Sequence, residues 1–307
     1  MSDDDGIDIS VCVATFRRPE GLRRLLASLR REVATAGFRV EVVVVDNDAD
    51  GSAAPTLAAA AAELPQLRSC REPRQGISHA RNAGVAVARG TWIAFIDDDE
   101  EAEPGWLHAY WSAVQQQPAD GWFGPVLPVA EGTPPRWFRS DVFFGYPDHP
   151  DGSRIGAEST RTGNALVRRA LLGVAPFDPA FGLTGGGDYE LFARLLDRGA
   201  VFRWCAAART RDHLPAARLR PGWLLQRAFR GGYTWTVVDR RRQPGLGADA
   251  KRIVRAAAGL TLFLLLLPID AARGWPAFTR RLRRICIQAG HLWVYLGRPV
   301  EPYRSGT

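Results

Sequence analysis

Three adjacent carboxylates, Asp97, Asp98 and Asp99, follow directly on an apolar run at residues 92–96. A short apolar run is typical of a buried strand, so the carboxylates are expected at its carboxyl end. Mg²⁺ and Mn²⁺ prefer oxygen ligands and keep coordination positions open for substrate phosphates. The spacing therefore predicts a metal site for a phosphorylated ligand. The alternative for this motif taken alone is a solvated acidic turn.

Two other predicted strands also end in polar residues. Residues 7–14 precede Thr15, Phe16 and Arg17, and residues 40–45 precede Asp46. Apolar β-branched runs alternate with helical patterns through the first hundred residues, which indicates an α/β fold with a mostly parallel sheet. In such sheets ligands bind at the carboxyl ends of the strands, so the three polar groups are expected at one edge. No Gly-x-Gly-x-x-Gly follows the first strand, which argues against a dehydrogenase.

Composition indicates a globular chain that can bury a sizeable core, since 46% of its 307 residues are hydrophobic. The four cysteines show no paired spacing, so neither a zinc site nor a disulfide framework is expected. The first six residues are acidic and lack an apolar segment, which argues against a secretory signal peptide. We therefore expect a cytoplasmic protein.

Charge is distributed unevenly along the chain. Residues 200–307 contain 20 Lys and Arg against 5 Asp and Glu. The uncharged, largely apolar run at residues 256–269 lies between basic clusters, and its 14 residues fall short of the ~20 that a spanning helix needs. We therefore expect an interfacial or re-entrant segment at an anionic membrane surface, with a buried core helix as the alternative. Nucleic acid is not expected, because aliphatic runs, not stacking aromatics, separate the basic residues.

Two later segments carry further candidates. Residues 131–160 are predicted to form a long loop whose aromatic side chains either stack on a sugar or cap the core; these are Trp137, Phe138, Phe143, Phe144 and Tyr146. Asp188 follows three glycines and is expected at the N-terminus of a helix over residues 189–198, as its N-cap or a first-turn residue. A capping role would not exclude a catalytic one.

Together these segments, over residues 7–215, resemble a family 2 glycosyltransferase of the GT-A fold, an inverting enzyme that uses a nucleotide-sugar. The motifs stand in the family's order. They are Val13-Ala14-Thr15-Phe16-Arg17-Arg18-Pro19, Val44-Val45-Asp46-Asn47, Gly76-Ile77-Ser78-His79-Ala80-Arg81-Asn82, Asp97-Asp98-Asp99, Thr162-Gly163-Asn164 and Thr184-Gly185-Gly186-Gly187-Asp188.

The resemblance implies a role for each matching residue. Thr15, Phe16 and Arg17 would line the base and ribose pocket, Asp46 would accept hydrogen bonds from uracil, and Arg81 would hold the base or the diphosphate. Asp98 would contact the ribose, with Asp97 supporting it, and Asp99 would bind Mg²⁺ or Mn²⁺ together with His213. Asp188 would be the general base.

The resemblance also implies substrates and organisation. The donor would be a UDP-sugar. The acceptor would be a glycan or a polyprenyl-linked molecule at the cytoplasmic face of the inner membrane, as in bacterial enzymes of succinoglycan-type exopolysaccharide synthesis. Residues 1–215 would form the GT-A domain and residues 216–307 a helical, membrane-associated region. Gly187 replaces the Glu that often precedes the base, and the Gln-x-x-Arg-Trp motif of processive synthases is absent, so transfer of one sugar is expected. The alternatives are a nucleotidyltransferase and a non-catalytic membrane-bound scaffold.

Overall fold

The computed structural model describes residues 6–144, 148–298 and 300, which divide into two compact units. Described residues 6–127 and 148–213 form the sheet unit, and residues 128–144, 214–298 and 300 form the helical unit. The chain passes between the units within β7 (Val126–Ala130) and β10 (Thr210–Leu214). Residues 128–144, which come early in the sequence, thus group with the C-terminal helices.

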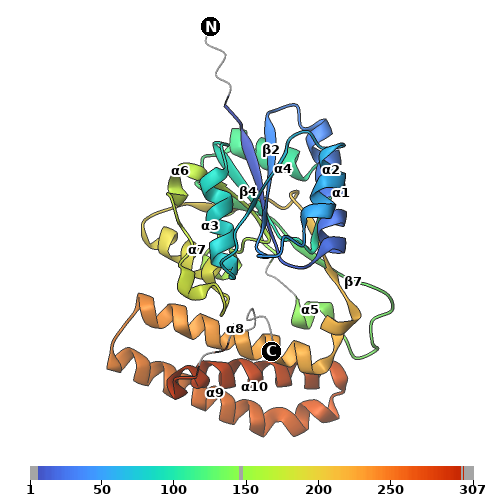
Figure 1. The fold of residues 1–307 in the computed structure, drawn as a ribbon. Helices are drawn as coiled ribbons and strands as arrows, with labels where there is room; N and C mark the ends of the chain where they lie inside the picture. The colour runs from blue at the N-terminus through green and yellow to red at the C-terminus, as the bar shows by residue number, and fades with distance from the viewer. Residues whose placement is uncertain (1–5, 145–147, 299, 301–307) are drawn as a thin grey trace. The chain divides into compact units, whose positions relative to one another are not determined.

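A seven-stranded sheet in the order β3-β2-β1-β4-β8-β6-β9 forms the centre of the sheet unit (Figure 1). Its strands are β1 (Ile9–Thr15), β2 (Val40–Asp46), β3 (Leu67–Arg71), β4 (Trp92–Ile96), β6 (Gly121–Phe123), β8 (Asn164–Arg168) and β9 (Phe202–Trp204). Strands β1 to β4 are parallel, and β8 is antiparallel to both β4 and β6. The mostly parallel α/β sheet predicted from the sequence is confirmed. A second sheet has the order β5-β10-β7, with β5 at Glu100–Ala102.

Helices cover both faces of the seven-stranded sheet (Figure 1). Alternate strand residues pack against α1 (Pro19–Thr35), α2 (Ala54–Ala61) and α4 (Trp106–Gln116) on one face. The other residues of the same strands pack against α3 (Ile77–Val87), α6 (Arg169–Leu172) and α7 (Gly187–Asp197) on the other. Because both faces are buried, β2 is apolar at five of its seven positions and does not alternate with polar residues.

The described residues of the segment 131–160, namely 131–144 and 148–160, have little regular structure, as predicted. They contain α5 (Ser140–Phe143) and a 3₁₀ turn at Ala157–Ser159. Phe143 and Phe144 are buried in a hydrophobic cluster with Leu214, Leu219 and Leu224. The structure therefore agrees with the core-capping alternative for these two side chains, while Tyr146 lies outside the described residues.

Three long helices make up most of the helical unit: α8 (Pro221–Arg242), α9 (Leu246–Ala272) and α10 (Trp275–Trp293). Among the described residues, the remaining elements are 3₁₀ turns at Pro179–Phe181, Ala216–Leu219 and Val294–Leu296. Helix α9 is the one helix among the described residues that is long and apolar enough to cross a membrane, and only 11% of its apolar window is buried. The core-helix alternative for residues 256–269 therefore does not fit the helical unit.

Candidate active site

The carboxyl ends of β1 and β4 are tied together by a buried hydrogen bond. These strands are parallel neighbours, so the residues that follow them meet at one edge of the sheet. Thr15 Oγ1 donates to Asp98 Oδ2 at 2.8 Å, and both residues are buried. The predicted meeting of Thr15 with the carboxylate cluster is therefore observed.

Arg18 joins two of the three adjacent carboxylates. Its Nη1 donates to Asp98 Oδ1 at 2.9 Å and to Asp99 Oδ2 at 2.8 Å. The close approach of α1 makes this possible: a Cβ on Gly21 would lie 2.5 Å from the carbonyl oxygen of Asp98, so the first turn of the helix needs a glycine there. The Arg18 guanidinium thus bonds one oxygen each of Asp98 and Asp99, the two residues expected to contact the ribose and the metal.

Arg17 turns away from this cluster. Its backbone has a φ of 53°, which is unusual for a residue other than glycine. The guanidinium bonds both carboxylate oxygens of Asp48, at 2.9 and 3.1 Å, and lies 5.2 Å from the centre of the Phe16 ring. The hydrogen bond from Arg17 lowers the pKa of Asp48 to about 2. Phe16 and Arg17 therefore form one polar and aromatic wall beside the end of β2.

Asp46 is buried at the end of β2, directly opposite Thr15 in the strand register. Its two carboxylate oxygens accept hydrogen bonds from the backbone N–H groups of Asp48 and Ala53, at 3.0 and 2.9 Å. In this structure Asp46 therefore holds the loop that follows β2. Each oxygen retains a second lone pair, so the predicted contact with a base stays a prediction.

Asp97 lies between Arg81 and the other carboxylates. Arg81 Nη2 donates to Asp97 Oδ1 at 3.0 Å, which links α3 to the end of β4. Desolvation raises the pKa of Asp97, Arg81 lowers it in part, and the charges of Asp99 and Asp188 raise it further. Arg81, Asp97, Asp99 and Asp188, which the sequence placed in one site, thus influence one another electrostatically.

Asp98 and Glu100 carry the strongest signs of crowded negative charge. Desolvation raises the pKa of Asp98 to about 6 despite its contact with Arg18, with the charge of Asp99 adding to the rise. Burial, with repulsion from Asp97, raises the pKa of Glu100 well above its usual range. Among the described residues, Glu100 Oε2 is buried without a hydrogen-bond partner. A bound cation would relieve this repulsion.

Asp188 is in the first turn of α7, as predicted, and Gly186 is the N-cap. Gly185 and Gly186 both have positive φ, which lets the loop turn sharply into the helix. The same loop packs backbone to backbone on the start of α3, where a Cβ on Gly76 would lie 3.2 Å from Gly182 Cα. Asp188 Oδ1 accepts the N–H of Tyr189 at 2.8 Å.

The backbone of His213 lies beside the backbone of Asp99. The His213 N–H donates to the Asp99 carbonyl at 3.1 Å, whereas the ring Nε2 lies 3.1 Å from Glu101 Oε2. Within the part of the chain that the structure describes, no three His, Cys, Asp or Glu side chains are grouped to hold a metal ion. The structure brings the predicted ligands Asp99 and His213 to the same place but engages their side chains with Arg18 and Glu101.

Sequence reasoning missed Arg18, Glu100 and Glu101 as parts of this site. The pair Arg17-Arg18, which follows the first strand after Phe16, is the sequence signal that points to Arg18. Glu101 could be found only from the antiparallel pairing of β5 with β10, which sets Glu101 opposite Arg211 and near His213.

Comparison with known proteins decides the family. Residues 10–173, more than half of the chain, match the family model of glycosyl transferase family 2. The chain belongs to this family. It is 34% identical over 306 residues to the succinoglycan biosynthesis protein ExoM of Rhizobium meliloti (strain 1021), a match that covers 97% of this chain and 95% of that protein. The resemblance drawn from the motifs is thereby confirmed, and so is the prediction of an enzyme.

Solved structures agree on the GT-A fold of this family 2 glycosyltransferase. The mannosyltransferase PcManGT from Pyrobaculum calidifontis, solved with GDP-Man and Mn²⁺, matches with a TM-score of 0.61 and 17% identity, covering 93% of this chain and 87% of that one. Residues 1–349 of S. aureus TarS with UDP match with a TM-score of 0.54 and 14% identity, covering 98% of both chains. The nucleotidyltransferase and scaffold alternatives find no support in these matches.

Proposed function

We propose that this glycosyltransferase moves one sugar from a UDP-sugar, with inversion, to a hydroxyl of a glycan or polyprenyl-linked acceptor in cell-surface polysaccharide synthesis. The observation that carries the proposal is the direct linkage of two strand ends, in which Thr15 and Arg18 both bond Asp98. The matches to ExoM and to a UDP-bound GT-A structure support the pathway class and the nucleotide.

The donor would lie along the edge formed by these strand ends. Thr15, Phe16 and Arg17 would border the base and ribose, and Asp46 would accept hydrogen bonds from the base. Arg81 would hold the base or the diphosphate, and Asp98 would contact the ribose, with Asp97 supporting it. Arg18 bonds Asp98 and Asp99 through its Nη1, and a guanidinium can also bond phosphate oxygens. We therefore add Arg18 to the residues that would meet the diphosphate.

The residues present fit a hard divalent cation. They offer the carboxylate oxygens that such a cation prefers. Desolvation and mutual repulsion raise the pKa values of Asp97 and Asp98, and an added positive charge would offset that repulsion. Asp99 would hold Mg²⁺ or Mn²⁺ together with His213, whose backbone N–H bonds the Asp99 carbonyl. When bound, the ion would stabilise negative charge on the leaving diphosphate.

Asp188 would act as the general base. Its carboxylate would take the proton of the acceptor hydroxyl while the hydroxyl oxygen forms a bond to the anomeric carbon. The bond from that carbon to the diphosphate oxygen breaks at the same time, and its electron pair leaves with the nucleotide. Attack from the face opposite the leaving group inverts the anomeric centre. A positioned base of this kind contributes ~10²–10⁴-fold to the rate.

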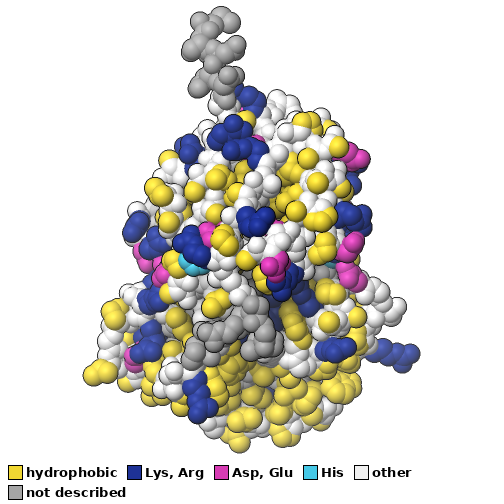
Figure 2. Space-filling view, in the orientation of Figure 1, with side chains coloured by type: hydrophobic (Ala, Val, Ile, Leu, Met, Phe, Trp, Pro, Cys, Tyr) yellow, Lys and Arg dark blue, Asp and Glu magenta, His cyan; other side chains and the backbone are white. Residues whose placement is uncertain are grey.

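The helical unit would hold the enzyme at the cytoplasmic face of the inner membrane. Helix α9 exposes several large apolar side chains, among them Leu246, Val254, Leu262 and Leu265. Figure 2 shows hydrophobic side chains gathered over the C-terminal helices. Basic residues stand on the same helices, and each Lys or Arg near an anionic surface adds ~1 kcal/mol.

The test is hydrolysis of a panel of UDP- and GDP-sugars by the full chain, with and without Mn²⁺. We expect turnover of a UDP-sugar that requires the metal and is lost in Asp99→Ala but kept in Asp141→Asn, a surface carboxylate of the helical unit with 59% of its side chain exposed. Turnover of GDP-sugars alone, or equal turnover in Asp99→Ala, would contradict the proposed donor or the proposed metal ligand.

A further inference from the structure

A pocket of about 380 Å³ opens between α8, α9 and α10 within the helical unit. Three basic side chains and one carboxylate line it, namely Lys251, Arg252, Arg255 and Asp239. The polar and aromatic part of its wall also includes Trp235, Thr236, Gln243, Gln288 and His291. None of these residues has a role in the sugar-transfer site described above.

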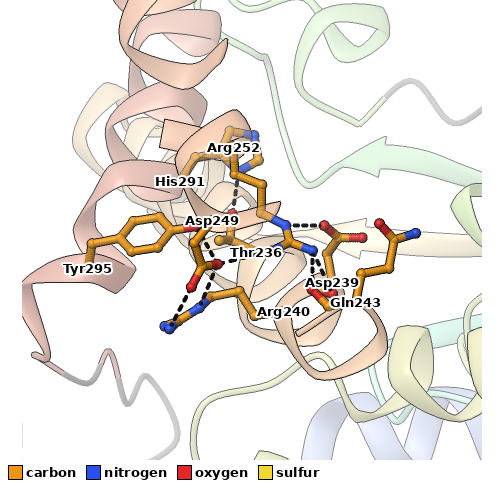
Figure 3. Close-up of polar contacts among 8 residues, drawn as sticks. All are labelled: Thr236, Asp239, Arg240, Gln243, Asp249, Arg252, His291 and Tyr295. Carbon is orange, nitrogen blue, oxygen red and sulfur yellow. Dashed lines mark hydrogen bonds and ion pairs between the residues drawn. The ribbon is translucent and has the colours of Figure 1, made fainter. Parts of the chain in front are cut away.

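Arg252 is already neutralised by its neighbours. Figure 3 shows its guanidinium reaching Asp239 and the end of α8 at Gln243. Its Nε donates to Asp239 Oδ2 at 2.5 Å and its Nη1 to Asp249 Oδ1 at 3.0 Å, while Nη2 bonds the carbonyl oxygens of Asp239 and Gln243. Asp249 also accepts hydrogen bonds from Arg240 and Tyr295. This network fixes one wall of the pocket and leaves no spare carboxylate there.

Lys251 and Arg255 are the unpaired cations of the pocket. Among the described residues, neither has a hydrogen bond or an ion pair in the structure. They stand four residues apart on α9, so their side chains project from the same helix face within reach of one small anion. Like charges at this spacing repel each other, and a bound anion would remove that cost.

The remaining wall supplies hydrogen bonds and an apolar surface. Thr236 Oγ1 lies 2.7 Å from His291 Nδ1, and burial lowers the pKa of His291, which favours the neutral ring. The indole of Trp235, 44% exposed, stands edge-on to that ring at 5.5 Å. Ala248 and Ala256 of α9 also line the pocket beside the two cations. Two cations beside apolar side chains fit a phosphate that carries an alkyl chain.

We propose that this pocket binds a phosphate monoester through Lys251 and Arg255, and that the phosphate is that of an anionic lipid headgroup. The apolar neighbours favour the lipid over free phosphate. The site is separate from the glycosyl transfer and would remain if the donor or acceptor proposed above were wrong.

Isothermal titration of the full chain with dihexanoyl phosphatidic acid, kept below its micelle concentration, tests the proposal. The pocket variant is Lys251→Gln/Arg255→Gln. The matched control is Arg280→Gln/Arg284→Gln, an exposed pair at the same spacing on α10 that does not line the pocket. We expect the pocket variant to bind roughly 30-fold more weakly than the native chain and the control variant to bind like it.

Two further ligands separate the sources of the phosphate. Inorganic phosphate should bind at least tenfold more weakly than phosphatidic acid, and dihexanoyl phosphatidylcholine, which has no net charge, should not bind. Equal binding of inorganic phosphate would overturn the assignment to a lipid. Equal losses in the two double variants, or no binding by the native chain, would overturn the pocket itself. Unchanged circular dichroism in both variants establishes that the helices are intact.

Discussion

Asn164 offers the sharpest quantitative prediction about how the site is held. It is fully buried, and its side-chain oxygen accepts hydrogen bonds from Trp106 Nε1 at 2.8 Å and Tyr110 Oη at 2.6 Å. Its side-chain nitrogen donates to the carbonyls of Pro125 and Ala208 at 3.0 and 2.7 Å. In the sheet it pairs with Ile96, the residue before Asp97. Asn164 therefore anchors the strand end that presents the carboxylates.

Replacement of Asn164 by Ala would leave three partner groups unsatisfied, those of Trp106, Tyr110 and Ala208, because the Pro125 carbonyl keeps a hydrogen bond from the Thr210 N–H. A buried group that loses its partner costs ~1–3 kcal/mol, so even the lower figure gives a loss of about 3 kcal/mol. This is a large share of the ~5–15 kcal/mol by which domains are stable. Asn82→Ala is the matched control, since it removes only two hydrogen bonds, both to Phe177, and should cost about 2 kcal/mol.

Urea unfolding followed by tryptophan fluorescence measures both variants, because Trp106, Trp122 and Trp204 are buried in the sheet unit. We expect the midpoint of Asn164→Ala to fall about one and a half times as far as that of Asn82→Ala, at a similar m-value. A loss below about 1 kcal/mol for Asn164→Ala, or one no larger than that of Asn82→Ala, would refute the reasoning.

Three further predictions concern packing and ionisation. Gly232→Ala should destabilise the helical unit by about 1–3 kcal/mol in thermal unfolding, because its Cβ would lie 2.1 Å from the Ile287 carbonyl oxygen. Gly231→Ala is the control: its Cβ would have no neighbour within 4 Å, so it should stabilise the unit by about 0.5–1 kcal/mol. The opposite order would contradict the packing of α8 on α10. Burial raises the pKa of Glu41, but hydrogen bonds from Ser10, Arg68 and Arg89 outweigh it and leave the pKa below the ordinary 4.5. The stability that Glu41 adds is therefore complete above pH 4.5 and is lost as the pH falls through the lower pKa of the folded state. The unfolding free energy measured from pH 6 to 3 should fall less steeply in Glu41→Gln than in the native chain. Parallel curves for the two proteins would contradict this. Burial raises the pKa of Cys205 to about 11, so iodoacetamide at pH 8 should leave Cys205 unmodified in the native chain and label it in urea, as read by peptide mass spectrometry; rapid native labelling would show that the side chain is accessible.

Local patterns predicted the sheet and the edge that carries the candidate site. The strands at residues 9–15, 40–46 and 92–96 are runs whose side chains are buried on both faces, and the helix from Pro19 shows a single leucine face. Because parallel strands end at the same edge, the meeting of Thr15 with the carboxylates followed from topology alone.

Other features depend on contacts between distant segments, which no local pattern encodes. Arg18 reaches Asp98 and Asp99 only because Gly21 lets α1 approach the backbone after β4. The aromatic side chains of residues 137–144 pack against residues 214–224, some 80 positions later in the chain. Helix α9 runs for 27 residues through the charged Lys251 and Arg255, so the uncharged run understated its length.

The most direct test of the central claim is transfer of radiolabelled sugar from UDP-sugars to acceptors in a bacterial membrane extract, with UDP binding measured in parallel. The account predicts transfer by the native chain and by Asp141→Asn, a loss of ~10²-fold or more in Asp188→Asn, and equal UDP binding by all three. Transfer by Asp188→Asn at the native rate would contradict the assignment of Asp188 as the base, and the absence of UDP binding by the native chain would contradict the proposed donor.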